Sequence, residues 1–389
     1  MSIPGEKPAE RFKHTELRLV DPPFNSPLTD LVIELDYLRK KSIGDTPSEI
    51  FMQIKDVFHF LESIGSARIE GNNTTVQEYV ESKLEHGKAP KENIVEIANM
   101  ESALGFIDAH VHERPIDRVF IGELHRMVVA GLTREGSANP GNYRGKNVAI
   151  KGTSHAPPPP GLVERYMVEL FEFINRPESP KYDLIKTALA HHRFVWIHPF
   201  DNGNGRTVRL VTYAMLVKQG FNVSHADRII NPTAVFCSDR KSYYEFLARA
   251  DGGTEEGLLA WTSYMLSGLK REIEKLDLLL DYRYLSERIL LPALDYSLER
   301  RLITAQEFQM LQVVVRKQRI ANSDIRRIMP DKDISDISKM IGRLKEKGML
   351  APVPGKKRIY ALGFAANYLL RGIIAALEKN DFLPKNDPA

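Results

Sequence analysis

The sequence predicts a mainly α-helical protein with a short β-hairpin near its middle and a basic C-terminal module. Three observations lead to this prediction. Apolar residues recur at helical spacing along most of the chain, a strand-like segment closed by prolines interrupts the helices at 147–155, and basic residues gather after residue 300. Because 389 residues correspond to two or three domains of ordinary size, we expect three regions, at 1–110, 111–295 and 300–375.

The first region begins with a charged, proline-rich arm at residues 1–25 and continues in helices. Thr46-Pro47-Ser48-Glu49 combines a capping box with proline at the first helical position, and both features are helix start signals. The apolar residues behind this signal lie on one helical face: Ile50, Phe51, Ile54, Val57, Phe58 and Leu61. Further helical patterns cover 74–86, 91–112, 116–131, 161–176, 181–197 and 205–219, followed by one long helix at 255–290.

The composition excludes several classes of protein. Hydrophobic residues make up 43% and charged residues 27% of the chain, which is ordinary for a soluble globular protein. The net charge is only +3, and a single cysteine, Cys237, excludes an intrachain disulfide framework and a cysteine-rich zinc site. The N-terminus lacks the apolar core of a signal peptide, and no uncharged apolar run approaches the ~20 residues of a membrane span. We therefore expect a cytoplasmic protein that does not contact membranes.

Residues 197–209, with the sequence IHPFDNGNGRTVR, form a tight loop between two predicted helices. Pro199 ends the first helix, and Gly203 and Gly205 let the backbone approach another group closely. The loop leads into the N-terminus of the next helix, where unpaired N–H groups and the helix dipole favour an anion. This pattern predicts a phosphate-binding loop.

Charged and titratable side chains surround this loop. Arg206 and Arg209 are three residues apart and therefore lie on the same side of the helix, which suits a polyphosphate. His198 at the edge of the loop is a proton acceptor near neutral pH. A second interpretation takes four side chains as ligands of a catalytic metal: His191, His192, His198 and Asp201. Because His191 and His192 are adjacent, they diverge by about 100° on a helix, which disfavours a shared ion.

The same stretch resembles the signature of the Fic family, His-Pro-Phe-x-(Asp/Glu)-Gly-Asn-Gly-Arg-x-x-Arg, at eleven of its twelve positions. Fic proteins are mostly adenylyltransferases, which move AMP from ATP to a hydroxyl side chain of a target protein. The resemblance covers residues 30 to 275 and implies a Fic-type helical bundle with a β-hairpin flap. ATP is the implied substrate and Mg²⁺ the implied cofactor, and the chain itself is a further implied target.

The resemblance also implies roles for individual residues. His198 takes the proton from the target hydroxyl, Gly203, Asn204 and Gly205 form the anion hole, and Arg206 contacts the terminal phosphates. The remaining residues implied to bind ATP are Thr207, Arg209, Tyr244 and Asp251. Two positions depart from the family. Asp251 replaces an asparagine, and Asn202 replaces the acidic residue that holds magnesium, which leaves the adjacent Asp201 as the second candidate ligand.

A second short motif resembles the inhibitory motif of the same family. Ser66 and Glu70 are one helical turn apart, and Gly71 follows them, within a predicted inhibitory helix at about 60–72. The resemblance implies that Glu70 pairs with Arg209 and occupies the space of the γ-phosphate. A solvated helix face is the ordinary interpretation of such a Ser–Glu pair taken alone.

The hairpin at 147–155 resembles the family's flap. A target segment is then expected to add to it as an extra strand through main-chain hydrogen bonds, beside Val148, Ile150 and Gly152. A structural hairpin that covers the core is the alternative.

The C-terminal module is basic: residues 316–358 contain thirteen basic and five acidic residues. Its pattern of short helices and a Pro354-Gly355 turn resembles a winged helix-turn-helix domain, which places four residues at candidate DNA contacts: Lys339, Arg343, Lys356 and Lys357. DNA binding and protein docking both remain open for this module, and a homodimer remains open for the chain.

Two rival functions remain beside AMP transfer. One is a nucleotide-sensing transcriptional regulator whose catalytic core is weak, which Asn202 favours and His198, Arg206 and Arg209 oppose. The other is an enzyme of the same fold that transfers another phosphate-linked group, or that removes AMP under the control of Glu70.

Overall fold

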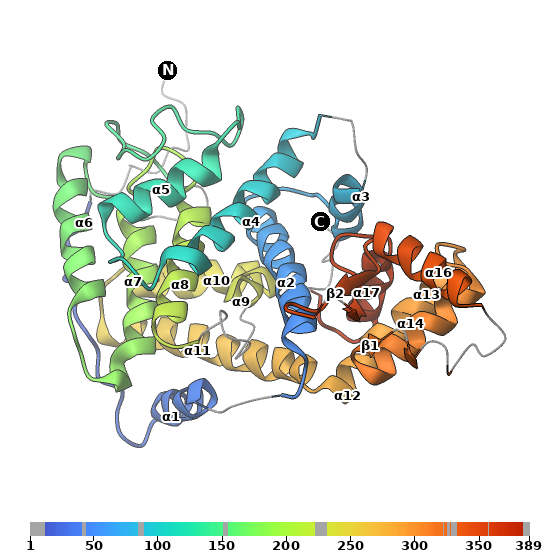
Figure 1. Ribbon diagram of the computed structural model, residues 1–389. Helices are drawn as coiled ribbons and strands as arrows, with labels where there is room; N and C mark the ends of the chain where they lie inside the picture. Colours follow the sequence, from blue (N-terminus) through green and yellow to red (C-terminus); the bar gives the residue numbers. More distant parts are fainter. Residues whose placement is uncertain are drawn as a thin grey trace.

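The computed structural model describes residues 12–40, 44–84, 89–150, 155–221, 232–321, 323–324, 327, 333–356 and 358–383. The described chain is mainly helical (Figure 1). The first five helices are α1 (Pro27–Lys40), α2 (Ser48–Ile69), α3 (Val76–Leu84), α4 (Glu92–His110) and α5 (Arg118–Val129). After a long connection come α6 (Pro160–Asn175), the 3₁₀ turn η1 (Pro180–Tyr182), α7 (Asp183–Ile197), α8 (Asn204–Lys218), α9 (Pro232–Ser238), α10 (Arg240–Ala250) and α11 (Glu255–Asp277).

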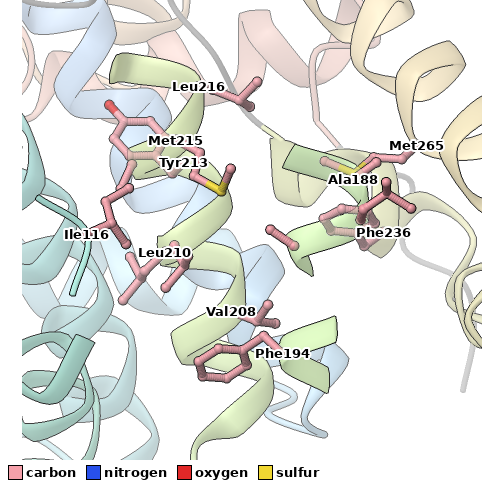
Figure 2. Packing of buried hydrophobic residues seen from close by; sticks show 14 of the residues in the cluster. Ile116, Ala188, Phe194, Val208, Leu210, Tyr213, Met215, Leu216, Phe236 and Met265 are labelled. Atoms are coloured by element: carbon pink, nitrogen blue, oxygen red, sulfur yellow. The ribbon is translucent and has the colours of Figure 1, made fainter. Parts of the chain in front are cut away.

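The first of two hydrophobic cores lies around α7 and α8, which pack against each other and are covered by α4, α5, α6 and α11. Phe194 and Val208 meet at its centre (Figure 2), and neither is measurably exposed. Trp261 of α11 also belongs to this core, and its ring N–H donates to the Ala188 carbonyl of α7 at 2.6 Å. Because α7 and α8 are buried on nearly every side, the loop between them has a rigid support.

The second core joins α2 to the C-terminal part of the chain. It contains the apolar face of α2, from Ile50 to Ala67, together with residues between Leu276 and Phe382. The expected boundary between the second and third regions, 111–295 and 300–375, falls inside this core, since Leu294 and Ile303 both belong to it. In Figure 1, α2 runs between the helices of the first core and the C-terminal elements.

The expected continuous helix at 255–290 is wrong, because the helix is interrupted after Asp277. A 3₁₀ turn η2 (Leu278–Leu280) follows α11, and Asp281 then adopts an extended conformation. Its carboxylate accepts a hydrogen bond from the Tyr284 N–H at 3.0 Å and starts a new helix as an N-cap. The chain continues through α12 (Tyr282–Leu285), the π-helical turn η3 (Ser286–Leu290) and α13 (Leu291–Glu299).

The C-terminal elements surround a small antiparallel sheet. They are α14 (Ala305–Lys317), β1 (Ile320–Ala321), α16 (Ile334–Glu346), β2 (Leu350–Pro352), β3 (Ile359–Leu362) and α17 (Leu369–Lys379). The strand order is β1-β3-β2, with Ile320 opposite Tyr360 and Ala351 opposite Ala361. The predicted Pro-Gly turn connects β2 to β3, and Gly355 adopts the left-handed φ of 74° that favours glycine there.

Polar contacts hold α2 against these elements. Gln53 donates to the Leu362 carbonyl at 2.8 Å and accepts from the Phe364 N–H at 2.7 Å. Glu49 receives two hydrogen bonds from the Arg319 guanidinium, at 2.5 and 2.9 Å. α2 is therefore fixed at its N-terminal half by the C-terminal elements.

The expected hairpin at 147–155 is described only in part. Residues 147–150 carry no strand, although Val148 and Ile150 are half-buried and alternate with exposed neighbours. Gly152 lies outside the described residues, as do Lys151, Thr153 and Ser154. Among the helices of the described chain, none has the length and apolar character needed to cross a membrane.

Candidate active site

His198 directly follows α7 and has a left-handed backbone conformation, with φ 50° and ψ 61°. This conformation is unfavourable for a residue with a side chain and persists where the surroundings enforce it. Arg144 supplies that constraint: its Nε donates to the His198 carbonyl at 2.7 Å, and its backbone N–H donates to the Pro199 carbonyl at 2.9 Å. The buried guanidinium also donates to the Pro158 carbonyl at 2.6 Å. Arg144 therefore fixes the point at which the imidazole leaves the helix.

The His198 imidazole is neutral at physiological pH. Burial lowers its pKa to about 4, and the nearby positive charge of Arg144 acts in the same direction. Its Nδ1 atom is buried and has no hydrogen-bond partner among the residues that the structure describes. A neutral imidazole with a free ring nitrogen can accept a proton from a bound hydroxyl group.

The loop after His198 is stabilised by its own side chains. The Asn204 amide accepts from the Phe200 N–H and donates to the Phe200 carbonyl, both at 2.9 Å. Gly203 has a left-handed φ of 73° and precedes the first residue of α8, while Thr207 donates to its carbonyl at 2.8 Å. A Cβ on Gly203 would lie 3.0 Å from Val129, so the position favours glycine on two grounds. The N-terminal amides of α8 thus point out of a well-defined turn, where they can bind an anion.

A carboxylate already lies at this helix N-terminus. A Cβ built on Gly205 would come within 2.1 Å of Glu70 Oε1, so the Glu70 side chain lies directly against the first turn of α8. Arg209 donates to Glu70 at 2.7 Å, to the Ser66 hydroxyl at 2.8 Å and to the Ser66 carbonyl at 3.0 Å. Ser66 and Glu70 therefore hold a fully buried guanidinium together.

Glu70 is ionised in this arrangement. Burial would raise its pKa, but the positive charge of Arg209 outweighs burial and holds the pKa below its usual value. Gly71 follows with a left-handed φ of 99° and ends α2 just after the carboxylate. The helix therefore ends directly after the residue that contacts Arg209.

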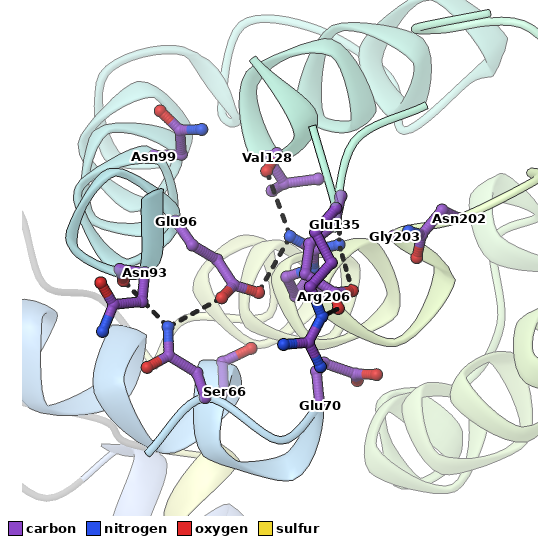
Figure 3. A network of polar contacts seen from close by, with 12 residues as sticks. Ser66, Glu70, Asn93, Glu96, Asn99, Val128, Glu135, Asn202, Gly203 and Arg206 are labelled. Carbon is purple, nitrogen blue, oxygen red and sulfur yellow. Dashed lines mark hydrogen bonds and ion pairs between the residues drawn. The ribbon is translucent and has the colours of Figure 1, made fainter. Parts of the chain in front are cut away.

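Arg206 has different partners from Arg209. Its guanidinium forms an ion pair with Glu96 at 3.0 Å and donates to the Glu135 carbonyl at 2.8 Å (Figure 3). Glu96 also accepts from Asn72 at 2.8 Å. Burial raises the pKa of Glu96, and the charge of Arg206 offsets this only in part. Arg206 thus connects α8 to α4 and to the loop that follows α5.

The two candidate metal ligands are occupied by loop contacts. Asp201 accepts from the Ser137 hydroxyl at 2.5 Å and from the Ala138 N–H at 2.9 Å. Asn202 accepts from the Gly203 N–H at 2.7 Å through its amide oxygen. The described part of the chain contains no group of three histidine, cysteine or acidic side chains with the geometry of a metal site.

The histidines of the alternative metal site point to other partners. His191 bonds to the Thr212 hydroxyl at 2.7 Å and to the Tyr243 hydroxyl at 2.9 Å. His192 bonds to Asp251 at 3.0 Å. Both histidines and Asp251 are therefore engaged in contacts between helices. Tyr244, which follows Tyr243 on α10, is 41% exposed.

The predicted C-terminal contact residues are exposed where the structure describes them. Lys339 and Arg343 lie on the outer face of α16, and Lys356 lies in the turn between β2 and β3. Lys357 lies outside the described residues.

Sequence reasoning missed three residues that shape the site. Arg144, Glu96 and His125 come from segments 50 to 110 residues before the loop, and all three are buried. The sequence contains no signal for them, because their burial and their partners are set by contacts between distant segments.

Part of this chain is similar to known proteins. Residues 115–216 match the model of the Fic/DOC family. A curated protein from Nematostella vectensis named "Protein adenylyltransferase Fic" is 30% identical over 240 residues, which are 58% of this chain and 51% of that protein. One with the same name from Drosophila grimshawi is 33% identical over 202 residues, or 50% of this chain and 38% of that protein. The chain thus spans about half or less of the length of these curated relatives.

Two solved structures share the fold. A Fic family protein from Desulfovibrio desulfuricans G20 aligns with 88% of this chain and 98% of its own, with a TM-score of 0.53 and 17% identity. Fic-1 from C. elegans aligns with 67% of this chain and 72% of that chain, with a TM-score of 0.52 and 22% identity. The fold and the loop describe a helical protein with a candidate anion-binding loop between two buried helices. Residues 115–216 thus match the Fic/DOC family, and the fold of this chain is similar to that of two Fic proteins.

Proposed function

We propose that this chain transfers AMP from ATP to a hydroxyl side chain of a target protein, and to hydroxyl groups of its own. The neutral His198 beside the anion-binding loop supports this reaction, as do the names of the curated relatives. The observation that carries the proposal is the carboxylate of Glu70 paired with Arg209 at the N-terminus of α8, because it marks the place where an anion binds.

In the proposed reaction, each residue of the site has a distinct role. His198 accepts the proton of the target hydroxyl, whose oxygen attacks the α-phosphorus of ATP. The bond from that phosphorus to the oxygen of the β-phosphate breaks, and pyrophosphate leaves. The N–H groups of Gly203 and Gly205 stabilise the charge that builds on the phosphate oxygens, which is usually the largest contribution in such transfers. Arg209 binds the terminal phosphates once Glu70 has left it.

Glu70 inhibits the chain in this proposal. Its carboxylate neutralises Arg209 and fills the space beside Gly205, so ATP phosphates compete with it for the same donors. The contact excludes phosphate both sterically and electrostatically.

Three proteins test the proposal: wild type, Glu70→Gly and His198→Ala in the Glu70→Gly background. Each is incubated with ATP labelled at the α-phosphate, and covalent label on protein is counted. We expect label on Glu70→Gly at a rate at least tenfold above wild type, and none above background when His198 is replaced. Glu299→Gly, at the exposed end of α13, is the matched control and should behave as wild type.

The contrary outcomes separate the rival functions. Equal label on wild type and Glu70→Gly contradicts inhibition by Glu70. Label from the γ-phosphate in place of the α-phosphate indicates phosphate transfer, and loss of label from protein modified beforehand indicates AMP removal.

Magnesium remains a prediction of the family resemblance. The donors present do not build a metal site, since Asp201 is bound to Ser137 and Ala138 and Asn202 carries no charge. We therefore assign no step to a metal held by this chain. If Mg²⁺ arrives with ATP, Asn202→Asp should lower the Mg²⁺ concentration that gives half-maximal labelling; an unchanged titration contradicts a role for this position.

The C-terminal elements support a second candidate function. The order α14, β1, α16, β2, β3 and the sheet order β1-β3-β2 suit a winged helix, with Lys339 and Arg343 exposed on its second described helix. We propose DNA binding through this face. Lys339→Glu with Arg343→Glu should abolish a gel shift of duplex DNA and the steep salt dependence of binding, and an unchanged shift contradicts the proposal.

We also propose that a target segment docks as an added strand beside residues 147–150. The alternating exposure of these residues supports this, because such alternation is typical of an extended segment, whose main-chain groups can pair with an added strand. Val148→Pro should lower transfer to an added target and leave ATP binding unchanged, whereas equal transfer contradicts strand addition.

A further inference from the structure

His125 lies beside the anion-binding loop, contacts it in two ways and has a third contact with the segment around Gly141. It belongs to α5, is fully buried, and stacks on Phe200 with ring centroids 3.7 Å apart and an angle of 3° between the planes. Its Nδ1 accepts from the Gly141 N–H at 2.8 Å, and its Nε2 donates to the Asn202 carbonyl at 3.0 Å. Both nitrogens are thus used, and only a neutral imidazole with the proton on Nε2 satisfies both bonds.

The bond to Asn202 determines the direction of the next N–H group. The Asn202 carbonyl and the Gly203 N–H belong to one peptide unit, and the described chain contains no cis peptide bond. In a trans peptide the C=O and N–H bonds point in opposite directions. Because His125 holds the carbonyl, the Gly203 N–H points away from α5, where it now donates to the Asn202 amide oxygen at 2.7 Å.

This peptide would otherwise be free to rotate. Gly203 has a left-handed φ and no side chain, so other orientations of the preceding peptide are accessible to it at low cost. Among the described contacts, the His125 bond is the one that holds this carbonyl from outside the loop.

We propose that His125 is a positioning residue: its Nε2–H fixes the Asn202–Gly203 peptide so that the Gly203 N–H is presented to the phosphate of the substrate. This inference rests on the proposed function of the loop and adds a residue from a different helix to it.

The surroundings keep the imidazole in the required form. Burial lowers the pKa of His125 to about 4; the negative charge of Asp201 opposes this, and the positive charges of Arg206 and Arg126 reinforce it. The donor and acceptor on the ring therefore do not change between pH 6 and pH 8.

Two nearly isosteric substitutions separate the two hydrogen bonds. In Glu70→Gly protein, His125→Gln places an amide N–H near the position of Nε2 and keeps the bond to Asn202. His125→Asn places its amide oxygen near the position of Nδ1 and keeps the bond to Gly141. His125→Phe keeps the ring stack on Phe200 and loses both bonds.

The proposal predicts the order of kcat/KM among the three variants. Displacing one preorganised donor costs about 100-fold in turnover, so His125→Asn and His125→Phe should lose roughly this factor in kcat/KM, while His125→Gln should stay within about tenfold of its parent. The melting temperatures of the Asn and Gln variants should be equal within a few degrees. If the Asn variant is as active as the Gln variant, or if activity follows melting temperature alone, the proposal is wrong.

A second readout keeps this test separate from the proposed function. ATP affinity is measured by calorimetry on the same four proteins. If the Glu70→Gly parent transfers no AMP, the proposed function fails, but weaker ATP binding by the Asn variant than by the Gln variant still supports the positioning role. Equal affinities in that case overturn it.

Discussion

Gln53 connects α2, the helix that ends at Glu70, to the C-terminal elements, which gives a direct way to test whether these elements keep Glu70 in place. Gln53 and Glu70 belong to the same rigid segment, since α2 runs without a break from Ser48 to Ile69 and Glu70 caps its end. The Gln53 amide bonds to the Leu362 carbonyl and the Phe364 N–H at the end of the sheet. A change near the N-terminal end of α2 is therefore expected to affect the position of Glu70 at its C-terminal end.

Gln53→Ala removes both bonds and leaves two backbone groups without partners. Each buried group left unsatisfied costs about 1–3 kcal/mol. If 1–3 kcal/mol of this cost appears as weaker docking of α2, the population in which Glu70 has left Arg209 rises about 5- to 150-fold. We therefore expect AMP transfer by otherwise wild-type protein to rise by at least about fivefold.

The assay is the rate of α-phosphate labelling in two backgrounds. In wild type, Gln53→Ala should accelerate labelling; in Glu70→Gly protein, where no inhibitory contact remains, it should have no accelerating effect. Gln77→Ala, on the exposed face of α3, is the matched control. Unchanged labelling in wild type, or the same change in both backgrounds, would refute the coupling of the C-terminal elements to Glu70.

Three further predictions concern stability. Gly205→Ala places a methyl group 2.1 Å from Glu70 Oε1, so it should lower the melting temperature more in wild type than in Glu70→Gly protein; an equal loss contradicts the close contact. Lys55→Met leaves the Asp108 carboxylate, whose side chain is only 13% exposed, without its cation at 2.5 Å; it should cost about 3–5 kcal/mol in urea unfolding, and a loss below about 1 kcal/mol contradicts this. Burial raises the pKa of Glu62 from 4.5 to about 8, so between these values the unfolded chain binds fewer protons than the folded chain, and wild type loses stability as pH rises. Glu62→Gln should therefore gain stability relative to wild type from pH 5 to pH 8, whereas a pH-independent difference would show that Glu62 is ionised in the folded protein.

The local structure of the site could be predicted because it depends on short-range rules. Pro199 ends one helix, Gly203 has the left-handed φ that its glycine permits, and the next helix begins at Asn204. The contact between Glu70 and Arg209 also agrees with the resemblance to the inhibitory motif. These features depend only on residue types and their spacing, and both can be read directly from the sequence.

The partners of the buried charges could not be predicted in the same way. Arg206 and Arg209 are three residues apart and were expected to face one ligand, yet one pairs with Glu96 of α4 and the other with Glu70 at the end of α2. Positions three apart on a helix still differ by about 60° in direction, which is enough to reach different neighbouring helices. Which helix lies in each direction is decided by packing over more than a hundred residues of chain.

The helix break at Asp281 and the sharing of α2 between two cores have a related cause. Apolar periodicity continues through Leu278, Leu279 and Leu280, so the pattern indicates a helix even where the chain turns. Likewise α2 is buried around most of its circumference. Its sequence shows one apolar face and does not indicate that the other faces also contact neighbouring elements. Periodicity indicates that a surface is buried and leaves open what covers it.

The charges around the loop bear on the proposal that the carboxylate of Glu70 inhibits the site. Arg206 is already neutralised by Glu96, and Arg209 is neutralised by Glu70, so the two motif guanidiniums together offer an anion no net charge. Removal of Glu70 exposes one full positive charge, since Arg206 keeps its partner. That charge is buried, where electrostatic interactions are stronger than in water. Asn202 brings no carboxylate, and the carboxylate of Asp201 is bound to Ser137 and Ala138. An ATP molecule therefore finds its principal cation in the residue that Glu70 releases, and Arg209→Ala should abolish transfer by Glu70→Gly protein more completely than Arg206→Ala does.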